Sequence, residues 1–494
     1  MPQIPYDKTS ATSILNHAKK LLGKSIHGLY PTATPLNTGK GDLGQCVEVY
    51  HFGYDINGTS EADFSCAGIE LKCTPLKTLK DGSMVSKERL VLNIINYLEE
   101  YDQDFETSSF KRKNALLLLM FYLHVAGVDN LDLVFKIIRL WSIPEEDLKI
   151  FMDDWNTIHT KIVKGLAHEL SEGDTLYLAA CVKGSKGGKN KRPQKKGGVL
   201  ADQRAYSIKS AYLNHIIVDS LSHPDLFDGV VMTPKKKNAI EKRKSEIGSI
   251  VKSITEYHQG ETFEQLVIRR FNPYIGMAIA EISAELQTEI SSSPKAISYS
   301  VCRAILGVKK RRIAEFEKAG IQLKTIRLEH DGKLKEAMSF QTIKYKDIIK
   351  EDEWCSSDWY DTIAARRFLF IVFRKKRNGS PSDAVLERVF FWSMPRKDVE
   401  AVEVFWRDTR NKVRIGDYAH FIKSTEHSIC HVRPKAKNAA DLTETPQGGK
   451  SKKMCYWLNR DYILNIINEH SREEKRDSVV SPRCTIATDK VKPE

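Results

Sequence analysis

The stretch "GTSEADFSCAGIELKCTP", residues 58–75, places Asp63, Glu70 and Lys72 around a short apolar segment. Residues 67–74 have the composition of a β-strand, and side chains two apart in a strand point to the same face. Glu70 and Lys72 are therefore expected to stand side by side, while the residue between them faces the core. Asp63 lies one short turn earlier, from where its side chain can reach the same place. The stretch predicts a strand that presents two carboxylates and one amine together.

Such a group suits the hydrolysis of a phosphodiester bond. Two carboxylates and a backbone carbonyl are hard oxygen ligands for Mg²⁺, which keeps several waters and accepts phosphate oxygens. The ion lowers the pKa of a bound water and stabilises the charge that develops on the phosphate. A neighbouring lysine can orient or deprotonate that water. The pattern Asp-x₆-Glu-x-Lys is loose, because many strands carry Glu-x-Lys on a solvated face. An ordinary strand with surface charges is the alternative.

The segment before this stretch favours an active site. Residues 42–53 are predicted to form a helix that begins at Asp42 as its N-cap and carries Glu48 toward the metal. "NTGKGDLG" at 37–44 offers glycine amides and Lys40 to a phosphate at the N-terminus of that helix. Taken alone, Glu48 is explained by a solvated helix position and the glycine segment by a turn.

A long apolar run follows, "ALLLLMFYLHVAGV" at 115–128, and Lys113 stands just before it. Residues 114–125 fit either a strand or a buried helix, because periodicity does not separate the two. Either way Lys113 lies at the edge of a core element, with a solubilising flank as the alternative. The run is too short to span a bilayer. Nearer the N-terminus, leucines at helical spacing predict a helix over 12–29.

The composition indicates a protein of several domains that binds a polyanion. With 494 residues the chain exceeds what one hydrophobic core can organise, so two or three domains are expected. Its 77 Lys and Arg against 64 Asp and Glu give a net charge of +13, which favours a nucleic-acid partner over a merely basic protein. The 9 cysteines include no CxxC pair, which argues against a zinc site and fits a reducing cytoplasm. The N-terminal residues "MPQIPYDKTS" lack a targeting signal, so we expect a cytoplasmic, soluble protein with no membrane partner.

Two short similarities reveal an internal repeat. "GIELKCTPLK" at 68–77 matches "GIQLKTIRLE" at 320–329, and "YLAACVKG" at 177–184 aligns with "ICHVRPKA" at 429–436. Both pairs have the same offset, since 320 − 68 and 429 − 177 both equal 252. Coincidence does not account for two matches at one offset close to half the chain length, so we infer two copies of one domain in tandem.

The predicted copies cover residues 1–222 and 263–494, with a charged linker over 223–262. The linker contains the run "TPKKKNAIEKRKSE" at 233–246. We interpret it as a solvated spacer, with a role in DNA binding as the alternative.

The first half resembles MutH, the mismatch-repair nickase, and the related type II restriction endonucleases that cut at GATC. The similarity is carried by segments in matching order: "KGDLGQCVE", "ADFSCAGIELKCTP", "KERLVLNIINY", "FETSSFKRK", "HELSEGDTLYL" and "QRAYSIKSAYLNHI". The two-copy layout is similar to the longer restriction enzymes of the family and differs from the single-domain nickase. The resemblance implies an α/β (α+β) fold of two tandem restriction-endonuclease-like domains of the PD-(D/E)xK type, each a mixed central sheet flanked by helices.

The resemblance also implies catalytic roles in the first copy. Asp63, Glu70 and Lys72 fall on the metal carboxylates and the catalytic lysine of the family motif. Glu48 falls on the helix glutamate that supports the Mg²⁺ site, and Lys113 falls on a second active-site lysine.

Two segments of the first copy are expected to approach DNA. Lys40 and Gly41 fall in the loop that approaches DNA in the family. "KGSKGGKNKRPQKKGG" at 183–198 holds many cations and glycines and no acid, so it should neutralise phosphates without reading sequence. A basic loop without a partner is the alternative.

By the resemblance, Lys183, Arg204 and Ser207, with Lys209 in the same segment, fall on the DNA-reading part of the first copy. Here the chain departs from the nickase, because Cys181 replaces an arginine and Ser207 replaces a tyrosine. The base contacts of the first copy are therefore less defined than its chemistry.

The second copy shows the opposite pattern. Its "HVRPKAKNAADLTET" at 431–445 is similar to the recognition loop of the nickase, with Arg433, Lys435 and Asn438 at matching positions. Its catalytic line has decayed: Glu315 and Gln322 replace the two metal carboxylates, Lys324 remains, and Arg367 falls near the second lysine. An amide is a far poorer Mg²⁺ ligand than a carboxylate, so this copy should bind DNA without cutting it. A scaffold role is the alternative.

The sequence and its resemblance together predict a Mg²⁺-dependent type II restriction endonuclease for double-stranded DNA containing GATC. Cutting before the G would leave 5′-phosphate overhangs. One active site per chain implies a homodimer on a palindromic site, and the second copy would serve as an effector or dimerisation domain. A methyltransferase of the same system would protect host DNA. The alternatives are a strand nickase in DNA repair and a non-catalytic DNA-binding protein.

Overall fold

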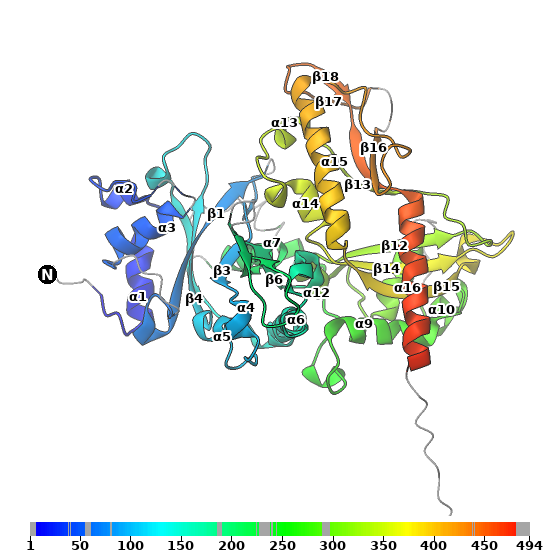
Figure 1. Cartoon of the computed structure of the whole chain (residues 1–494), viewed down its shortest axis with the longest axis horizontal. Helices are drawn as coiled ribbons and strands as arrows, with labels where there is room; N and C mark the ends of the chain where they lie inside the picture. The colour runs from blue at the N-terminus through cyan, green and yellow to red at the C-terminus, as the bar shows by residue number, and fades with distance from the viewer. Residues whose placement is uncertain are drawn as a thin grey trace, which may run out of the picture. The chain divides into compact units, whose positions relative to one another are not determined.

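The computed structural model describes most of the chain, and Figure 1 shows its helices and strands. The described residues are 6–37, 39, 41–54, 61–79, 82–184, 190–223, 225–226, 238, 241–243, 245–288, 297–436, 438 and 440–480. No helix within these ranges is both long and apolar enough to cross a membrane.

The main sheet of the first copy carries the predicted catalytic strand. Its strands have the order β2-β1-β4-β5, and Figure 1 labels β1 and β4. Their bounds are Met84–Ser86 for β2, Ile69–Thr78 for β1, Leu116–Leu123 for β4 and Phe135–Trp141 for β5. β1 and β4 are parallel, whereas β2 and β5 pair antiparallel at the two edges, so the sheet is mixed. Residues 116–123 of the apolar run thus form a central strand, which explains why most of this strand is buried.

A second sheet of the first copy carries the segment that was expected to read DNA. Its strands have the order β3-β9-β6 and pair antiparallel. Their bounds are Leu90–Ile94 for β3, Arg204–Ile208 for β9 and Leu178–Val182 for β6. Because β9 is the central strand, it has neighbours on both sides, and every one of its residues is buried. A small hairpin of β7 (Lys191–Arg192) and β8 (Ala201–Asp202) follows the basic loop.

Helices flank these two sheets, in agreement with the expected fold class. Their bounds are Tyr97–Glu100 for α4, Ser109–Lys113 for α5, Glu145–Val163 for α6 and Ser210–Ser220 for α7. α6 begins after Pro144 with three acids in its first turn, which suit the positive end of the helix dipole. Its buried residues, including Phe151, Trp155, Ile158 and Ile162, recur every three or four positions and form one core-facing stripe.

The helix predicted over 12–29 is interrupted. α1 covers only Ala11–Ala18, with Ser10 as its N-cap. Gly23 then takes a left-handed backbone with φ of 76°, which a helix does not accommodate. Ser25 caps a new short helix, α2, over Ile26–Leu29. The leucine spacing was correct for the core but did not reveal the break.

The helix that carries Glu48 is present, but its start differs from the prediction. α3 spans Asp42–Cys46 and continues as a π-helical turn over Val47–His51. Its N-cap is Gly41, so Asp42 is already inside the helix. The Asp42 carboxylate instead accepts the backbone N–H groups of Leu36 and Asn37, both at 2.8 Å, and so fixes the loop before the helix.

The second copy repeats the strand order of the first. The sheet β12-β14-β15 corresponds to β1-β4-β5, the sheet β13-β19-β16 corresponds to β3-β9-β6, and the hairpin β17-β18 corresponds to β7-β8. The strand bounds are Gln322–Leu328 for β12, Met338–Thr342 for β13, Phe368–Arg374 for β14, Val385–Trp392 for β15, Cys430–Pro434 for β16, Leu442–Glu444 for β17, Lys450–Lys452 for β18 and Met454–Leu458 for β19. The repeat detected from two short matches therefore extends through the whole topology.

The helices repeat in the same way. Thr262 caps α9 as Ser10 caps α1, and 262 − 10 is again 252. The helix bounds are Phe263–Phe271 for α9, Ile279–Glu285 for α10, Ile297–Ile305 for α11, Ala314–Ala319 for α12, Tyr345–Ile348 for α13, Asp358–Ile363 for α14, Arg396–Ile415 for α15 and Arg460–Val480 for α16.

The compact units of the chain do not coincide with the two copies. One unit contains Met1–Ile326, Ile363–Val372 and Pro381–Arg396, and the other contains Arg327–Thr362, Phe373–Ser380 and Lys397–Glu494. The first unit thus holds the whole first copy together with most of the sheet β12-β14-β15. The second unit holds the sheet β13-β19-β16. The domain boundaries given above remain a prediction from the repeat.

Within the first unit, the two copies meet at α7 and α12. A Cβ built on Gly320, at the end of α12, would lie only 3.1 Å from the Cβ of Ala211 in α7. Lys318 donates to both carboxylate oxygens of Asp147, at 2.9 and 2.7 Å, and the same carboxylate accepts the Tyr212 hydroxyl at 2.8 Å. A glycine and a buried ion pair therefore fix this contact.

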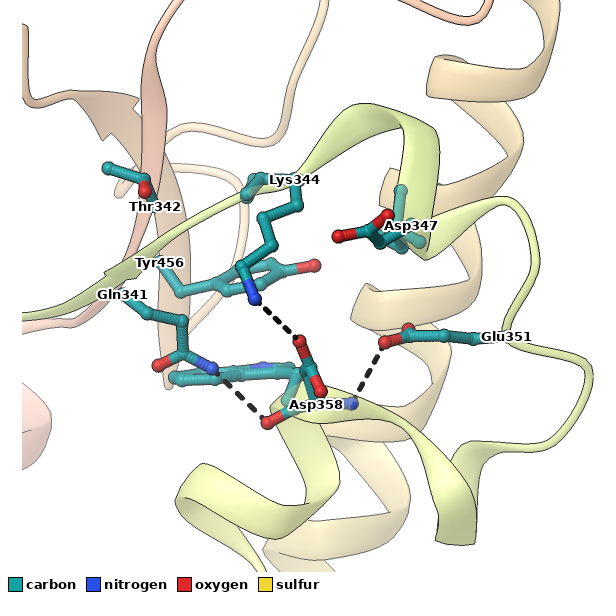
Figure 2. Close-up of a pocket in the computed structure, with 10 residues that line it drawn as sticks. Gln341, Thr342, Lys344, Asp347, Glu351, Asp358 and Tyr456 are labelled. Carbon is teal, nitrogen blue, oxygen red and sulfur yellow. Dashed lines mark hydrogen bonds and ion pairs between the residues drawn. The ribbon is translucent and has the colours of Figure 1, made fainter. Parts of the chain in front are cut away.

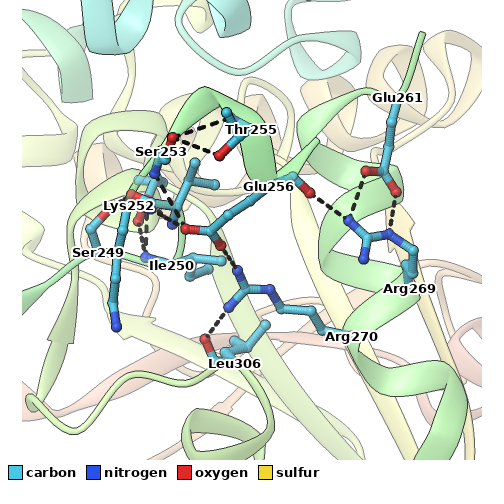
Figure 3. Close-up of polar contacts among 12 residues, drawn as sticks. Ser249, Ile250, Lys252, Ser253, Thr255, Glu256, Glu261, Arg269, Arg270 and Leu306 are labelled. Carbon is cyan, nitrogen blue, oxygen red and sulfur yellow. Dashed lines mark hydrogen bonds and ion pairs between the residues drawn. The ribbon is translucent and has the colours of Figure 1, made fainter. Parts of the chain in front are cut away.

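The end of the predicted linker belongs to the fold of the second copy. Strand β10 (Ile247–Gly248) pairs with β11 (Arg312–Ile313). Figure 3 shows the segment that follows, where Glu256 is bonded to Arg270, and Glu261 to Arg269. Residues 245–262 are therefore not a solvated spacer. Most of the basic run at 233–246 lies outside the described residues.

Candidate active site

A tight loop brings the two predicted metal carboxylates together. Phe64 and Ile69 form an antiparallel bridge around a 3-10 turn, and Gly68 closes the loop with a left-handed φ of 64°. The Asp63 carboxylate accepts the backbone N–H of Leu71 at 2.8 Å, while the N–H of Asp63 donates to Glu70 Oε2 at 3.3 Å. The spacing of Asp-x₆-Glu is thus the length of this loop.

Two lysines converge on Glu70, whose exposed fraction is 2%. Lys72 Nζ donates to Glu70 Oε1 at 2.5 Å, from two residues further along the same strand. Lys113 Nζ, at the C-terminal end of α5, lies 3.7 Å from the same oxygen. The structure thus brings both lysines to Glu70, and their catalytic roles stay a prediction.

Glu48 completes the group from the π-helical turn. The pKa of Glu48 is raised to about 7, first by burial and then by the charge of Asp63, while Lys72 opposes the shift. Burial also raises the pKa of Glu70, with Lys72 opposing and Asp63 adding to the shift. α3 approaches β1 closely, since a Cβ on Gly44 would lie 3.9 Å from the Cβ of Cys73. A loop, a strand and two helices therefore bring these side chains close enough for their charges to affect one another.

This donor set fits a hard divalent cation. Three carboxylates, from Glu48, Asp63 and Glu70, face two lysines, so the negative charge is not fully compensated, and the burial of Glu48 and Glu70 makes their charged forms costly. A cation with oxygen preference would stabilise the charged forms of these acids. These residues therefore fit the Mg²⁺ ion that the resemblance implies.

A different cluster lies at the surface. His27, Asp129 and Asp132 hold ligand atoms within 4.8 Å of one another. His27 Nδ1 is already bonded to Asp132 at 2.9 Å, and both aspartates are exposed. We interpret this cluster as a surface ion pair.

The loop expected to approach DNA is only partly described. Gly41 caps α3, and a Cβ on it would meet no atom within 4 Å, so the chain there is open. Lys40 lies outside the described residues. Lys183 is exposed at the end of β6, where its backbone N–H donates to the carbonyl oxygen of Gln203 at 2.8 Å. Residues 185–189 of the basic loop also lie outside the described residues.

The structure places the other expected DNA contacts of the first copy in the interior. Arg204 is 4% exposed and donates to the carbonyl oxygens of Ala180, at 2.5 Å, and Leu170. Ser207 is fully buried and donates to the carbonyl oxygen of Ala179 at 3.3 Å. These side chains join β9 to the structure around it, and in this arrangement they do not face a ligand.

Lys209 is also buried, with an exposed fraction of 8%. Its Nζ donates to the carbonyl oxygens of Thr175 and, at 3.1 Å, Ala365. Burial lowers the pKa of Lys209 to about 8, and the charge of Asp154 opposes this shift. The expectation that it contacts DNA is therefore not matched by the geometry either, because Ala365 belongs to the second copy and occupies that side.

The segment of the second copy that was predicted to recognise DNA carries exposed residues. Arg433 is exposed, and its guanidinium lies 4.9 Å from the ring centroid of Trp457. Lys435 is exposed and donates to Ser339 Oγ and to the carbonyl oxygen of Phe340, both at 3.0 Å. Asn438 is exposed as well.

In the second copy, the residues at the positions of the catalytic group make contacts within the fold. Glu315 is 7% exposed, and its carboxylate accepts the backbone N–H groups of Ile250 and Val251, each at 3.0 Å. Arg367 forms a two-pronged ion pair with Glu264, at 2.6 and 2.7 Å. Gln322 begins β12 and is half-buried. The place that holds a metal-type site in the first copy therefore holds a loop anchor in the second.

Sequence reasoning missed Asp154, which positions the strand before the basic loop. Its carboxylate accepts the backbone N–H groups of Leu176, Tyr177 and Leu178 at 2.6–2.9 Å. Burial raises the pKa of Asp154 to about 7, against the effect of these hydrogen bonds. No spacing rule reveals it, because its partners follow 22 to 24 residues later.

Comparisons with known proteins agree with this arrangement. The family model described as DNA mismatch repair enzyme MutH matches residues 52–154 and 307–403, so one matched segment falls in each copy. The chain is also 32% identical over 481 residues to the type II restriction enzyme Sau3AI of Staphylococcus aureus. The aligned part covers 91% of this chain and 92% of that protein. The similarity spans both copies, and the predicted fold of two tandem restriction-endonuclease-like domains is confirmed.

Proposed function

Because the chain belongs to the MutH-related type II restriction enzymes, we propose that it cuts both strands of double-stranded DNA at GATC in a Mg²⁺-dependent reaction. The observation that carries this proposal is the group formed by Glu48, Asp63, Glu70, Lys72 and Lys113 in the first copy. The proposal includes a cut before the G that leaves 5′-phosphate overhangs.

The residues of the first copy divide the chemistry among them. Glu48, Asp63 and Glu70 would hold the ion, which supplies an activated water and stabilises charge on the phosphate when it is bound. Lys72, whose Nζ lies 2.5 Å from Glu70 Oε1, would orient the attacking water. Lys113, at 3.7 Å from the same oxygen, is placed to stabilise negative charge on the phosphate.

One catalytic group per chain supports a homodimer on the palindrome, with each chain cutting one strand. The exposed Arg433, Lys435 and Asn438 support DNA binding by the second copy, as an effector or dimerisation domain. In the first copy, Lys183 and the loop at Gly41 are the remaining candidates for DNA contact, with Lys40 beside it. A methyltransferase in the same system and a cytoplasmic location complete the proposal.

A repair nickase and a non-catalytic DNA-binding protein are the rival functions. The duplicated half argues against the nickase, because one domain would suffice for a single-strand cut. The complete carboxylate and lysine group argues against the binder, since the second copy shows how such a group decays: Gln322 and Glu315 no longer form a metal-type pair.

The test uses supercoiled plasmid with GATC sites, the full chain and Mg²⁺, followed by sequencing of the product ends. We expect linear fragments that end at GATC, and no cleavage with Lys72→Ala or with EDTA. Lys324→Ala, the matching change in the second copy, is the control and should leave cleavage in place. Nicked circles as the final product would favour the nickase, and a shifted but uncut plasmid would favour the binder.

A further inference from the structure

The first copy contains a buried carboxylate that serves two aromatic side chains. Glu100, the last residue of α4, is 1% exposed. Its Oε1 accepts the hydroxyl of Tyr206 at 2.7 Å and the indole N–H of Trp155 at 3.0 Å. Both aromatic groups, which are themselves buried, are therefore satisfied by one acid.

The second copy keeps these residue types but not both bonds. Trp406 donates to Glu351 Oε2 at 3.1 Å, as Trp155 does to Glu100. Tyr456 on β19 has the place of Tyr206 on β9, but its hydroxyl has no hydrogen-bond partner among the described residues, although the residue is only 3% exposed. α13 ends at Ile348 where α4 ends at Glu100, and the acid comes three residues later.

The Tyr456 hydroxyl lies in a pocket of the second compact unit, shown in Figure 2. Asp347, Glu351 and Asp358 line this pocket, and Lys344 is the one cation among its lining residues. Lys344 Nζ lies 3.6 Å from Asp358 Oδ2, and three acids stand against one lysine among the lining residues. In Figure 2 the Tyr456 hydroxyl and the Asp347 carboxylate both point toward the middle of the group.

We propose that this pocket binds a small ammonium-type cation, either the ammonium ion or the terminal –NH₃⁺ of an alkylamine. Such a group donates several hydrogen bonds, and the pocket offers it the Tyr456 oxygen and the Asp347 carboxylate as acceptors. Burial raises the pKa of Tyr456, and the charges of Glu351 and Asp358 raise it further, which agrees with a negative environment.

The chemistry favours an ammonium group over a divalent metal ion. Among the described residues, the ligand atoms of His27, Asp129 and Asp132 lie within 4.8 Å of one another, and the three acids of the pocket form no such group. An ammonium group needs no such convergence, because each of its N–H bonds can reach a different acceptor.

Binding should stabilise the sheet that contains Tyr456. β19 pairs with β13 and β16, and Tyr456 stands opposite Val432, the neighbour of Arg433. Gln341 of the pocket follows Phe340, whose carbonyl oxygen accepts Lys435. An occupied pocket would thus raise the thermal stability of the unit that carries these strands.

The first experiment measures the binding of labelled methylammonium to the full chain by equilibrium dialysis. Thermal unfolding is measured in parallel at constant ionic strength. We expect saturable binding of one methylammonium per chain and a rise in the unfolding temperature with ammonium or methylammonium chloride. Sodium and tetramethylammonium chloride should give no such rise, because neither ion donates N–H bonds. Equal effects of all four salts would mean general charge screening and would overturn the proposal.

Matched tyrosine variants locate the site. Tyr456→Phe should lose the saturable binding with little change in stability without the cation, because its hydroxyl has no described partner to lose. Tyr206→Phe should lower the unfolding temperature, since it removes the bond to Glu100, but it should keep methylammonium binding. Asp347→Asn should weaken binding by about tenfold or more, as expected for the loss of a charged acceptor. Unchanged binding by both Tyr456→Phe and Asp347→Asn would show that the cation does not bind here.

Discussion

Glu70 is the residue on which the catalytic group depends. It is nearly fully buried, it lies between two lysine ammonium groups, and the backbone N–H of Asp63 donates to it. Its counterpart in the second copy, Gln322, has the same length and shape without the charge. The chain thus contains both the acid and its neutral replacement in the same structural place.

Glu70→Gln should reduce DNA cleavage by about a thousandfold or more, because it removes one charged ligand of the ion. The unfolding temperature should change little, since the substitution keeps the shape of the side chain and removes a buried charge. Single-turnover cleavage and thermal unfolding measure the two effects. Substantial cleavage by the variant would contradict the metal role of Glu70.

His51, on the same π-helical turn as Glu48, makes folding sensitive to pH. Its Nε2 donates to the carbonyl oxygen of His17 at 3.0 Å, and its Nδ1 lies 3.0 Å from the Tyr30 hydroxyl, an arrangement of the neutral ring. Burial lowers the pKa of His51 to about 4, and the neighbouring His17 adds to this effect.

Because the pKa is lower in the folded than in the unfolded state, the stabilisation is complete above the unfolded value of about 6.5 and is lost as pH falls toward 4. The loss should reach about 3 kcal/mol at most. Urea unfolding at a series of pH values measures it. His51→Gln should show a smaller decrease over this range, and an identical decrease would assign the effect to other groups.

At the scale of single elements, the sequence predicted features that depend on neighbouring residues. It did not predict contacts between residues that are far apart in the chain. The strand predicted at 67–74 is present as β1, but it starts two residues later, after a 3-10 turn, and extends to Thr78. Its existence was predictable because alternation of side chains is a property of neighbouring residues. The Asp42 cap was wrong because its carboxylate is used by the loop before the helix. The burial of Arg204 and Lys209 was not predictable, since their acceptors lie 24 to 156 residues away and only folding brings them together.

Asp154 is the clearest case of an element held by one side chain. Asp154→Ala would leave three backbone N–H groups at the start of β6 without their acceptor. We expect a loss of about 3 kcal/mol or more in the free energy of unfolding. Asn156→Ala, at an exposed position of the same helix, is the control and should stay within about 0.5 kcal/mol of the original chain. Equal urea midpoints for both variants would argue against this role.

At the scale of the whole molecule, the two copies differ in the residues that they keep. The proposed catalytic group lies in the first copy, and the exposed residues proposed to recognise DNA lie mainly in the second. The repeat itself was predictable from sequence, because two matches at one offset suffice. The compact units were not, because part of the second copy packs with the first through α7 and α12.

The ion pair between Lys318 and Asp147 should contribute strongly to this contact. Lys318→Met would leave a buried carboxylate that is 4% exposed without its cation, at a cost of about 3–5 kcal/mol in the stability of the first unit. The double variant Lys318→Met with Asp147→Asn should recover part of the loss. Calorimetric unfolding of the four chains measures the coupling, and additive effects would mean that the two residues act independently.

The contacts of Glu315 make a second nuclease centre in this chain hard to form. Its carboxylate now holds the backbone of Ile250 and Val251, ahead of the first helix of the second copy. A second nuclease centre could return only if this acid released that segment, and the release would weaken the fold before any activity was gained. A change at Glu315 alone would therefore be harmful, so this anchor opposes the formation of a second centre in descendants of this chain.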